Sequence, residues 1–390
     1  MMKKINSIIK NFVKEHLFEQ KVKQFQMSLP SDLIVLSNAF KREKKPLYVV
    51  GGAVRDAIQG KTPKDYDVAT SATPEQIITI IKMLPQGHKI IEIGKAFGVI
   101  NVITPQGNEY EIATFRKDVG AGRRPDSVEF TSIEKDVLRR DLTINALFYD
   151  IDQGVVVDYV GGIEDIENNV VRTVGDPNLR FGEDRLRILR ALRFASRLNS
   201  NLDPMTSKAI KSDNSLTGVS HERIRDEFLK GVSGTQKPSF FIDLIDEFDL
   251  WSQIFPKLHI TSWAITTTNK IVLLAVLLHE NDPELLAKQL GNLKYTLIEI
   301  AQIKFLTLFK KLNIENAYTL KKLFLTSHLS DSDLIEYSNE IGRPNKNLLN
   351  AFIKYKPSIK GNQLISQGFK GQELGKELVR QETERFKEIL

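Results

Sequence analysis

Residues 47–70 read LYVVGGAVRDAIQGKTPKDYDVAT, and this stretch holds the strongest local signals of the chain. The apolar run Leu47–Val50 is long enough for a buried strand, and Gly51 and Gly52 follow it directly. The next residues, up to Ile58, favour a short helix. A glycine pair between a strand and a helix lets the backbone approach a phosphate closely. We therefore expect a strand, a tight turn and a helix that together cradle phosphates.

Two carboxylates follow at Asp65 and Asp67, after the chain breaks at Gly60 and Pro63. Alternate side chains of an extended strand share one face, so both aspartates are expected to point the same way. Carboxylates this close repel each other unless a cation lies between them, and such hard oxygen donors suit magnesium. This pair therefore predicts a magnesium site, although an isolated Asp-x-Asp is more often a solvated turn.

The composition of the chain excludes several classes of site. At 390 residues we expect more than one domain. There is no cysteine, which excludes disulfides, thiolate zinc sites and a cysteine nucleophile. No apolar run approaches the ~20 residues that a membrane helix needs, and the polar N-terminus is unlike a secretory signal. A cytoplasmic protein with no membrane partner is the expectation.

The charge of the chain is weakly basic and unevenly distributed. The net charge is +6, and residues 1–45 carry ten Lys or Arg against four Asp or Glu, a surplus equal to that of the whole chain. Such a surplus suits a polyanionic partner, but a modest positive charge is common among proteins of all kinds. Apolar residues at helical spacing up to about Met27 predict that this basic segment is an amphipathic helix.

Two polar motifs follow on later segments. Glu111 lies in the alternating stretch Tyr110–Arg116, which is typical of a strand, and would be a third carboxylate that faces the aspartate pair. The second motif, Arg139-Arg140-Asp141, lies further along the chain, within the stretch from Asp136 to Asp150. An exposed strand glutamate and a helix-surface salt bridge are the simpler interpretations of these two motifs.

A third motif opens a helical stretch. Asp184 and Arg187 are three residues apart, so they are expected to share a face of one helical turn, and Arg190 continues that side. Five apolar residues from Ile188 to Leu198 form one stripe at helical spacing. A solvated ion pair worth only ~0.2–0.5 kcal/mol is the alternative to a binding role.

From Leu47 to Phe228, the motifs and their order resemble the class II tRNA nucleotidyltransferases and bacterial poly(A) polymerases, within the polymerase-β-like superfamily. The resemblance implies an α/β head followed by an all-α neck, body and tail. The expected divisions are a helical basic extension over 1–30, a catalytic head over 31–165, a neck over 166–233, a body over 234–320 and a tail over 321–390.

The resemblance also implies the reaction, which is template-independent addition of C, C and A from CTP and ATP to the 3′ end of tRNA. The tail is expected to contact the tRNA elbow. The family implies that Asp65, Asp67 and Glu111 are catalytic and that the two aspartates hold two Mg²⁺ ions. It implies nucleotide binding, with base selection by Asp184 and Arg187, for Gly51, Gly52, Arg55, Arg140, Asp141, Asp184, Arg187 and Arg190. It also implies that Arg223 and Glu227 brace the neighbouring helix.

Three other functions stay open at this point. The loop Lys117–Asp126 keeps the Arg-Arg-Pro of the family at 123–125 but is shorter before it, and a reduced loop is typical of enzymes that add only CC. A poly(A) polymerase that acts on general RNA 3′ ends would share every motif. A catalytically silent RNA-binding protein on the same fold is a more remote alternative, and the intact Asp-x-Asp pair argues against it.

Overall fold

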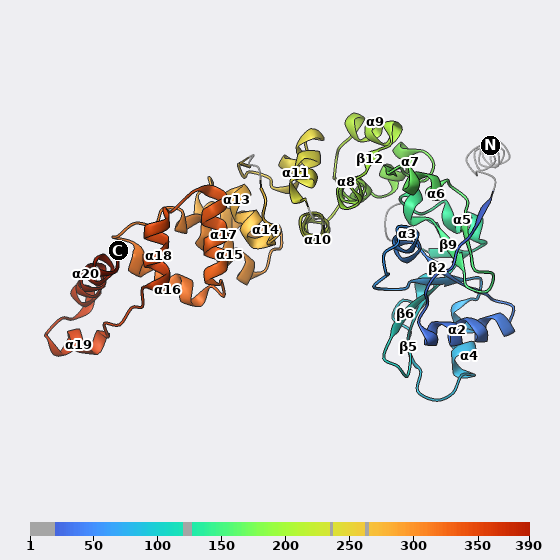
Figure 1. Cartoon of the computed structure of the whole chain (residues 1–390), viewed down its shortest axis with the longest axis horizontal. Helices are drawn as coiled ribbons and strands as arrows, with labels where there is room; N and C mark the ends of the chain where they lie inside the picture. The colour runs from blue at the N-terminus through green and yellow to red at the C-terminus, as the bar shows by residue number, and fades with distance from the viewer. Residues whose placement is uncertain (1–19, 120–126, 235–236, 262–264) are drawn as a thin grey trace. The chain divides into compact units, whose positions relative to one another are not determined.

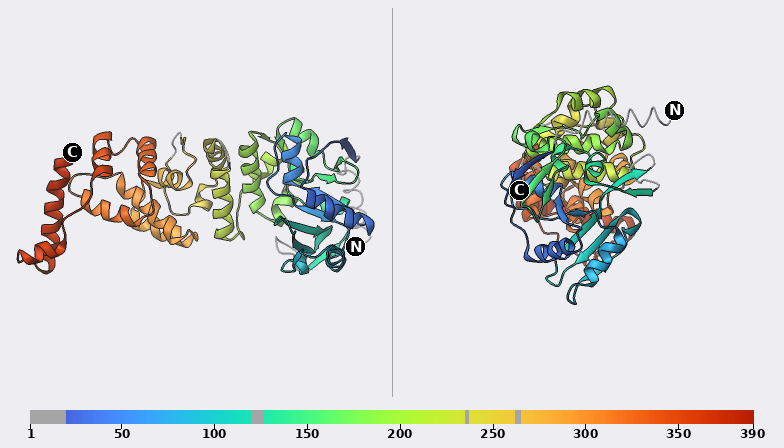
Figure 2. Two further views of the ribbon diagram at one scale, coloured as in Figure 1. Left: turned by 60° about the horizontal axis from the view of Figure 1, so that its bottom comes forward. Right: turned by 90° about the vertical axis from the view of Figure 1, so that its right-hand side faces the viewer.

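The computed structural model describes residues 20–119, 127–234, 237–261 and 265–390 (Figure 1). The chain divides between Asn214 and Ser215 into two compact units. The first unit is built on a β-sheet with helices, and the second consists of helices and the loops that join them (Figure 2). The predicted α/β head followed by a mostly helical region is confirmed. The boundary between the units lies inside the range 166–233 that was expected for the neck.

The main sheet of the first unit has eight strands in the order β1-β10-β9-β2-β3-β6-β5-β4. All strand contacts in it are antiparallel except that between β3 and β6. The strands of the first unit are β1 (Lys21–Gln24), β2 (Leu47–Val50), β3 (Val68–Thr70), β4 (Lys89–Ile91), β5 (Val99–Ile103), β6 (Glu109–Thr114), β7 (Arg116–Val119), β8 (Ser127–Phe130), β9 (Phe148–Asp150), β10 (Val155–Asp158), β11 (Val170–Val171) and β12 (Asn201–Leu202).

The helices of the first unit cover this sheet and continue beyond it. They are α2 (Ser31–Arg42), α3 (Gly52–Ile58), α4 (Pro74–Lys82), α5 (Ile133–Val137), α6 (Gly162–Glu167), α7 (Pro177–Glu183), α8 (Leu186–Leu198) and α9 (Pro204–Ser212), with 3₁₀ turns η1 (Lys95–Phe97) and η2 (Thr143–Asn145). The predicted start of α4 is confirmed as a capping box. The Thr73 hydroxyl accepts from the Gln76 N–H at 3.4 Å, and the Gln76 side chain accepts from the Thr73 N–H at 3.0 Å.

The two faces of the main sheet have different partners. On one face, α2 and α4 pack over fully buried side chains such as Leu47, Val68 and Ile112. On the other face, Tyr48, Phe115 and Phe148 form a cluster with ring centroids 5.8–6.4 Å apart. Val50 at the end of β2 pairs with Phe148 of this cluster, so the residues that follow β2 begin beside this second face.

The described end of the N-terminal segment corrects one prediction. Residues 1–19 of the expected amphipathic helix lie outside the described part of the chain, but Lys21–Gln24 form strand β1. β1 pairs antiparallel with β10, with Lys21 opposite Asp158 and Gln24 opposite Val155. The helical periodicity therefore did not extend to these residues, because the unpaired edge of the sheet offers their backbone a better set of hydrogen bonds.

The second unit contains the remaining helices. They are α10 (His221–Ser233), α11 (Pro238–Glu247), α12 (Trp251–Ile254), α13 (Lys270–Leu278), α14 (Pro283–Asn292), α15 (Leu297–Phe309), α16 (Ala317–Thr326), α17 (Asp331–Ile341), α18 (Lys346–Lys354), α19 (Gly361–Ser366) and α20 (Gly371–Ile389). Throughout α13 the described side chains from Ile271 to Leu278 are buried, so this helix is the centre of its core. In the part of the chain that the structure describes, no helix is long and apolar enough to cross a membrane.

Candidate active site

The glycine turn forms as predicted, between β2 and α3. Gly51 has φ +67° and ψ −122°, a conformation that a residue with a side chain rarely adopts. Its N–H donates to the Leu147 carbonyl at 3.1 Å. A Cβ atom at Gly51 would lie 3.5 Å from the Asn145 carbonyl oxygen and 3.8 Å from the Arg140 guanidinium. The turn therefore brings its backbone next to the Arg140 guanidinium.

Asp65 and Asp67 are both exposed, but they lie just before β3 and not within it. The prediction that the pair sits in a strand is wrong in this detail, because regular pairing of β3 with β2 begins at Val68 opposite Val49. The Asp67 carbonyl still accepts from the Val50 N–H at 2.9 Å, so its backbone is held at the entrance to the sheet.

Glu111 lies beside Asp67 in the sheet. The parallel pairing of Val68 with Ile112 places the residue before β3 next to Glu111 on β6, and both side chains are exposed. Partial burial and the neighbouring Asp65 charge raise the pKa of the Asp67 carboxyl, while Arg140 opposes the rise. Partial burial and the Asp67 charge likewise raise the pKa of Glu111. The charges of Asp67 and Glu111 thus lie close together, and the Asp65 charge adds to the repulsion at Asp67.

These carboxylates are suited to magnesium together with a nucleotide. Among the described residues, no three Asp, Glu or His side chains converge closely enough to form a complete metal cage. Mg²⁺ usually takes only one or two protein carboxylates and completes its shell with water and substrate phosphates. Asp65 and Asp67 match that donor set, and their mutual repulsion is what a divalent cation would relieve.

Arg140 stands between the glycine turn and the carboxylates. Its guanidinium lies 4.6 Å from the Phe148 ring centroid and donates to Asp136 at 3.0 Å and to the Asn145 carbonyl at 3.3 Å. Burial lowers the pKa of Arg140, and Asp136 opposes the change. Since Phe148 pairs with Val50 at the end of β2, this cation is fixed on the same face as Asp67.

Asp141 is engaged by Arg190 of α8. The Arg190 guanidinium donates to one Asp141 oxygen at 2.6 and 2.7 Å, while the other oxygen accepts from the Leu142 N–H at 2.8 Å. Burial alone would raise the pKa of Asp141, but Arg190 holds the pKa below its usual range. The two residues that were predicted separately as nucleotide contacts therefore form one ion pair.

Asp184 and Arg187 do not share a helical turn, so this prediction is wrong. Asp184 has extended dihedrals, φ −153° and ψ 104°, and separates α7 from α8. Its carboxylate accepts from the Leu186 N–H at 3.2 Å, as a helix-capping side chain does, and its carbonyl accepts from the Arg187 N–H at 3.0 Å. The competition of a capping aspartate with the helix is the physical reason for the break.

Hydrogen bonds and an ion pair hold the Arg187 side chain to both α7 and the head. It donates to the carbonyls of Arg180 at 3.1 Å and Arg139 at 2.9 Å, and it pairs with Glu183. Arg187 thus lies in the first turn of α8, just after Asp184, and is braced by backbone carbonyls from two other segments.

Arg55 differs from its predicted role. Its side chain is buried, with 3 % exposed, and it donates to Asp56 at 2.7 Å and to the Asn145 side chain. A phosphate-binding arginine must present donors to the ligand, so the structure does not support Arg55 as a direct contact.

Arg223 and Glu227 lie on α10, which belongs to the second unit. Glu227 is buried, with 3 % exposed, and Arg223 is partly exposed. Their bracing of the nucleotide-binding helix stays a prediction.

Sequence reasoning missed Asp136, which organises the arginines. This carboxylate is 1 % exposed and accepts from Arg139 at 2.9 Å, from Arg140 at 3.0 Å and from the Arg116 N–H at 3.1 Å. Burial would raise the pKa of Asp136, but the two guanidinium groups and the backbone hydrogen bond hold it below its usual range. The signal was present in the sequence, since Asp136 precedes the two arginines by three and four residues.

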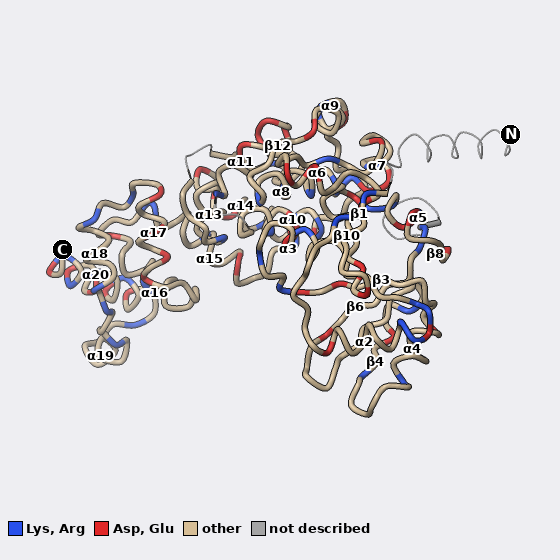
Figure 3. The backbone as a smooth tube through the Cα atoms, turned by 45° about the vertical axis from the view of Figure 1, so that its right-hand side comes forward, with Lys and Arg blue, Asp and Glu red and all other residues tan. Residues whose placement is uncertain are grey.

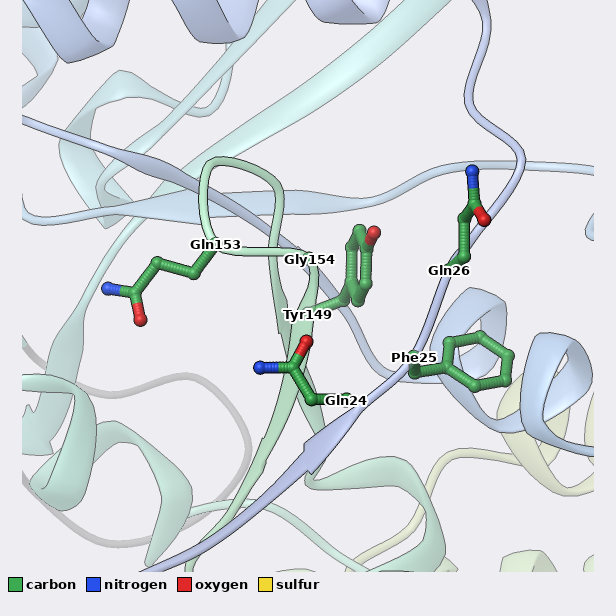
Figure 4. A pocket seen from close by; sticks show the side chains of 6 residues that line it. All are labelled: Gln24, Phe25, Gln26, Tyr149, Gln153 and Gly154. Carbon is green, nitrogen blue, oxygen red and sulfur yellow. The ribbon is translucent and has the colours of Figure 1, made fainter.

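A surface pocket of about 350 Å³ lies elsewhere. It is lined by Gln24, Phe25, Gln26, Tyr149, Gln153 and Gly154 (Figure 4). Tyr149 follows Phe148 on β9, so its side chain points to the opposite face of the sheet. None of the predicted site residues lines this pocket, and we assign it no part in the site. Basic and acidic residues are interspersed along the part of the chain that the structure describes (Figure 3).

Two family models match this chain in succession. The Poly A polymerase head domain matches residues 47–172, and the probable RNA and SrmB-binding site of polymerase A matches residues 201–261. The first match contains the glycine turn, all three carboxylates and the Arg-Arg-Asp motif.

Comparison with known proteins identifies the same family over most of the chain. The CCA-adding enzyme of Lactobacillus helveticus is 33% identical over 352 residues, which cover 84% of this chain and 86% of that enzyme. Another curated CCA-adding enzyme is 43% identical over 203 residues, about half of each chain.

Solved structures agree with the sequence comparison. The Bacillus stearothermophilus CCA-adding enzyme in complex with CTP has a TM-score of 0.70 at 25% identity and covers 90% of this chain and 92% of its own. The Thermotoga maritima CCA-adding enzyme complexed with tRNA shares the fold, with a TM-score of 0.67 at 21% identity and coverage of 97% and 94%. The chain therefore belongs to the family of CCA-adding enzymes, the tRNA nucleotidyltransferases whose head resembles that of poly(A) polymerases.

Proposed function

We propose that this chain adds C, C and A in turn to the 3′ end of tRNA, using CTP and ATP, and that the residues described above carry the reaction. The observation that supports the proposal is that four features lie close together around the Arg140 guanidinium. These are the Gly51 turn, the Asp67–Glu111 pair, Arg140 above Phe148, and the Asp141–Arg190 ion pair that joins the head to α8.

The carboxylates would act at the reacting atoms. Asp65 and Asp67 would hold two Mg²⁺ ions, which lower the pKa of an attacking hydroxyl and neutralise the triphosphate charge. Glu111, beside Asp67 and with a raised pKa, would accept the proton of the tRNA 3′-hydroxyl as it attacks the α-phosphate. The bond to the β-phosphate then breaks and pyrophosphate leaves.

The glycine turn and the arginines would hold the triphosphate and the sugar. Gly51 leaves room for phosphate oxygens close to the backbone, and Arg140 supplies a fixed cation 3.8 Å from the position of a Cβ atom there. Asp141 can accept from a ribose hydroxyl, because Arg190 keeps it ionised.

Base selection is assigned to the start of α8. A carboxylate that accepts and a guanidinium that donates match C and A, which present an amino donor beside a ring-nitrogen acceptor. G and U present a carbonyl acceptor beside a ring N–H donor, which is the reverse order. Asp184, just before α8, and Arg187, in the first turn of α8, would supply this pair, and the carbonyls that hold Arg187 would keep it in place without a nucleic acid template. The tRNA body would be held by the second unit, including the lysines between Lys354 and Lys376 in the tail.

The test is extension of a tRNA that lacks its 3′ CCA, resolved to single nucleotides, with Mg²⁺ and CTP, ATP or both. We expect growth by C and C with CTP alone, growth by C, C and A with both, and arrest after A. The same tRNA with a 2′,3′-dideoxy end serves as a control, because it lacks the attacking hydroxyl.

Two other outcomes would revise the proposal. Arrest after CC with both nucleotides would favour a CC-adding enzyme, the function to which the shortened Lys117–Asp126 loop points; residues 120–126 of that loop lie outside the described part of the chain. A long ladder with ATP alone would favour a poly(A) polymerase.

A further inference from the structure

Helix α8 is attached to the head at three levels along one side. Arg187 donates to the Arg139 carbonyl, and Arg190 pairs with Asp141 one turn later. Phe194, a further turn along, contacts Arg55 of α3. Positions 187, 190 and 194 follow the i, i+3, i+7 spacing of a single helix face, so the three contacts with the head lie along one side of α8.

The third level is unusual because its centre is a buried cation. The Arg55 guanidinium carbon lies 5.0 Å from the Phe194 ring centroid, and the Arg55 residue is only 2 % exposed. Two of its nitrogens donate to one Asp56 oxygen, at 2.9 and 2.7 Å, and the third donates to the Asn145 side chain. Its donors therefore point into the protein.

The partners of Arg55 reach the rest of the site. The Asn145 main-chain carbonyl accepts from Arg140 and lies against the Gly51 turn. The Asn145 side-chain nitrogen is buried without a hydrogen-bond partner, so the Oδ1 bond to Arg55 is what orients this amide. On the other side, Asp56 lies 3.6 Å from Arg197, one turn beyond Phe194 on α8. The Arg55 cluster thus joins the glycine turn to α8 at two places.

We propose that Arg55 is a positioning residue that couples the Gly51–Gly52 turn to α8, so that base selection depends on a side chain that does not touch the nucleotide. This inference rests on the proposed function of α8. Its physical basis is that a planar guanidinium can serve two hydrogen-bonded partners in its plane and an aromatic ring on its face at once, which a lysine cannot do.

The experiment compares Arg55→Lys with Phe194→Leu. For each variant, single-nucleotide incorporation of CTP, ATP, UTP and GTP is measured on tRNA that lacks CCA and on tRNA that ends in CC. We expect both variants to lower the preference for the correct nucleotide about tenfold. We also expect the double variant to be little worse than either single variant, because both remove the same contact.

A second readout separates positioning from phosphate binding. Equilibrium affinities are measured for CTP and for CMP. If Arg55 acts through α8, Arg55→Lys weakens both ligands by the same factor. If it contacts the β- or γ-phosphate, only CTP binding is weakened, and the inference is overturned. Unchanged base preference in Phe194→Leu would also overturn it. Because the binding comparison needs no turnover, it decides the inference even if the wild-type chain extends no tRNA.

The chain offers a matched control. Arg225 on α10 makes the same bonds to Asp226, at 2.9 and 2.6 Å, as Arg55 makes to Asp56, and it has no assigned part in the site. Arg225→Lys should leave base preference and both affinities unchanged. Phe194→Tyr keeps the ring and should retain the wild-type preference. If Phe194→Leu fails to fold, as judged by thermal melting, the comparison of Arg55→Lys with Phe194→Tyr still decides the inference.

Discussion

Asp67 and Glu111 are exposed, lie beside one another, and have raised pKa values. Asp136 and Asp141, a short distance along the chain, lie beneath arginines and have lowered pKa values. Arginines neutralise the charge of the second pair, whereas the first pair is left under mutual repulsion. The difference teaches that one site contains carboxylates whose charge is left for a cation to neutralise and carboxylates whose charge the protein's own arginines neutralise, and each kind can be altered separately.

The largest expected effect is on activity. Asp67→Ala should lower kcat/KM for CTP incorporation by at least about 10³-fold, because the main carboxylate for the metal ions is lost. Its melting temperature should stay the same or rise slightly, since like-charge repulsion is relieved. Steady-state kinetics and thermal melting of the same sample measure both. Turnover close to that of the wild type would contradict the two-metal assignment.

Asp136→Ala should have the largest effect on stability. Removing this carboxylate leaves Arg139 and Arg140 without their shared partner, and we expect a loss of about 3 kcal/mol in the free energy of unfolding. Urea unfolding of the Mg²⁺-free protein measures it. The control is Glu164→Ala, which removes an ion pair whose side chains are 56% and 61% exposed and should cost under about 0.5 kcal/mol. Equal losses in the two variants would show that Asp136 does not organise the arginines.

A smaller effect is expected at Glu111. Glu111→Gln keeps the shape of the side chain but cannot accept a proton, and kcat should fall about 10- to 100-fold with little change in KM. Glu109→Gln, two residues earlier on the same face of β6, is the matched control and should stay within about twofold of the wild type. If both variants lose the same activity, Glu111 contributes only negative charge to the strand and does not accept the proton.

Lowering the pH should separate the two kinds of carboxylate. Asp67 and Glu111 take up protons at pH values above the ordinary carboxyl pKa of about 4. Activity should therefore begin to fall above that pH as the solution is acidified, and added Mg²⁺ should shift the fall to lower pH. Asp136 and Asp141 contribute stability at pH values above the pKa that they have in the unfolded chain. This stability is lost only as the pH falls through their lower pKa values in the folded protein. Parallel pH–rate and unfolding profiles should show inactivation before unfolding. Coincident profiles would remove the distinction between the two groups.

The sequence was sufficient where a motif and the backbone conformation depend on the same residues. The glycine turn, the capping box of α4 and the α/β head followed by helices were predicted correctly, since each follows from local spacing or from the ordered motifs. It was insufficient where a distant segment decides the outcome. The burial of Arg55 depends on Phe194 and Asn145, which are far away in sequence, and β1 depends on the free edge of β10.

The pairing of β1 with β10 also bears on how the protein avoids self-association. All four residues of β10 are buried, whereas all four of β1 are exposed, and Lys21 and Lys23 on β1 reach Glu164 and Glu167. β1 therefore replaces an apolar sheet edge with one that carries charge, and charged edge strands resist the addition of strands from another chain. Without β1, β10 would present Val155, Val156 and Val157 at an open edge, which is the template for intermolecular β-pairing that leads to aggregation.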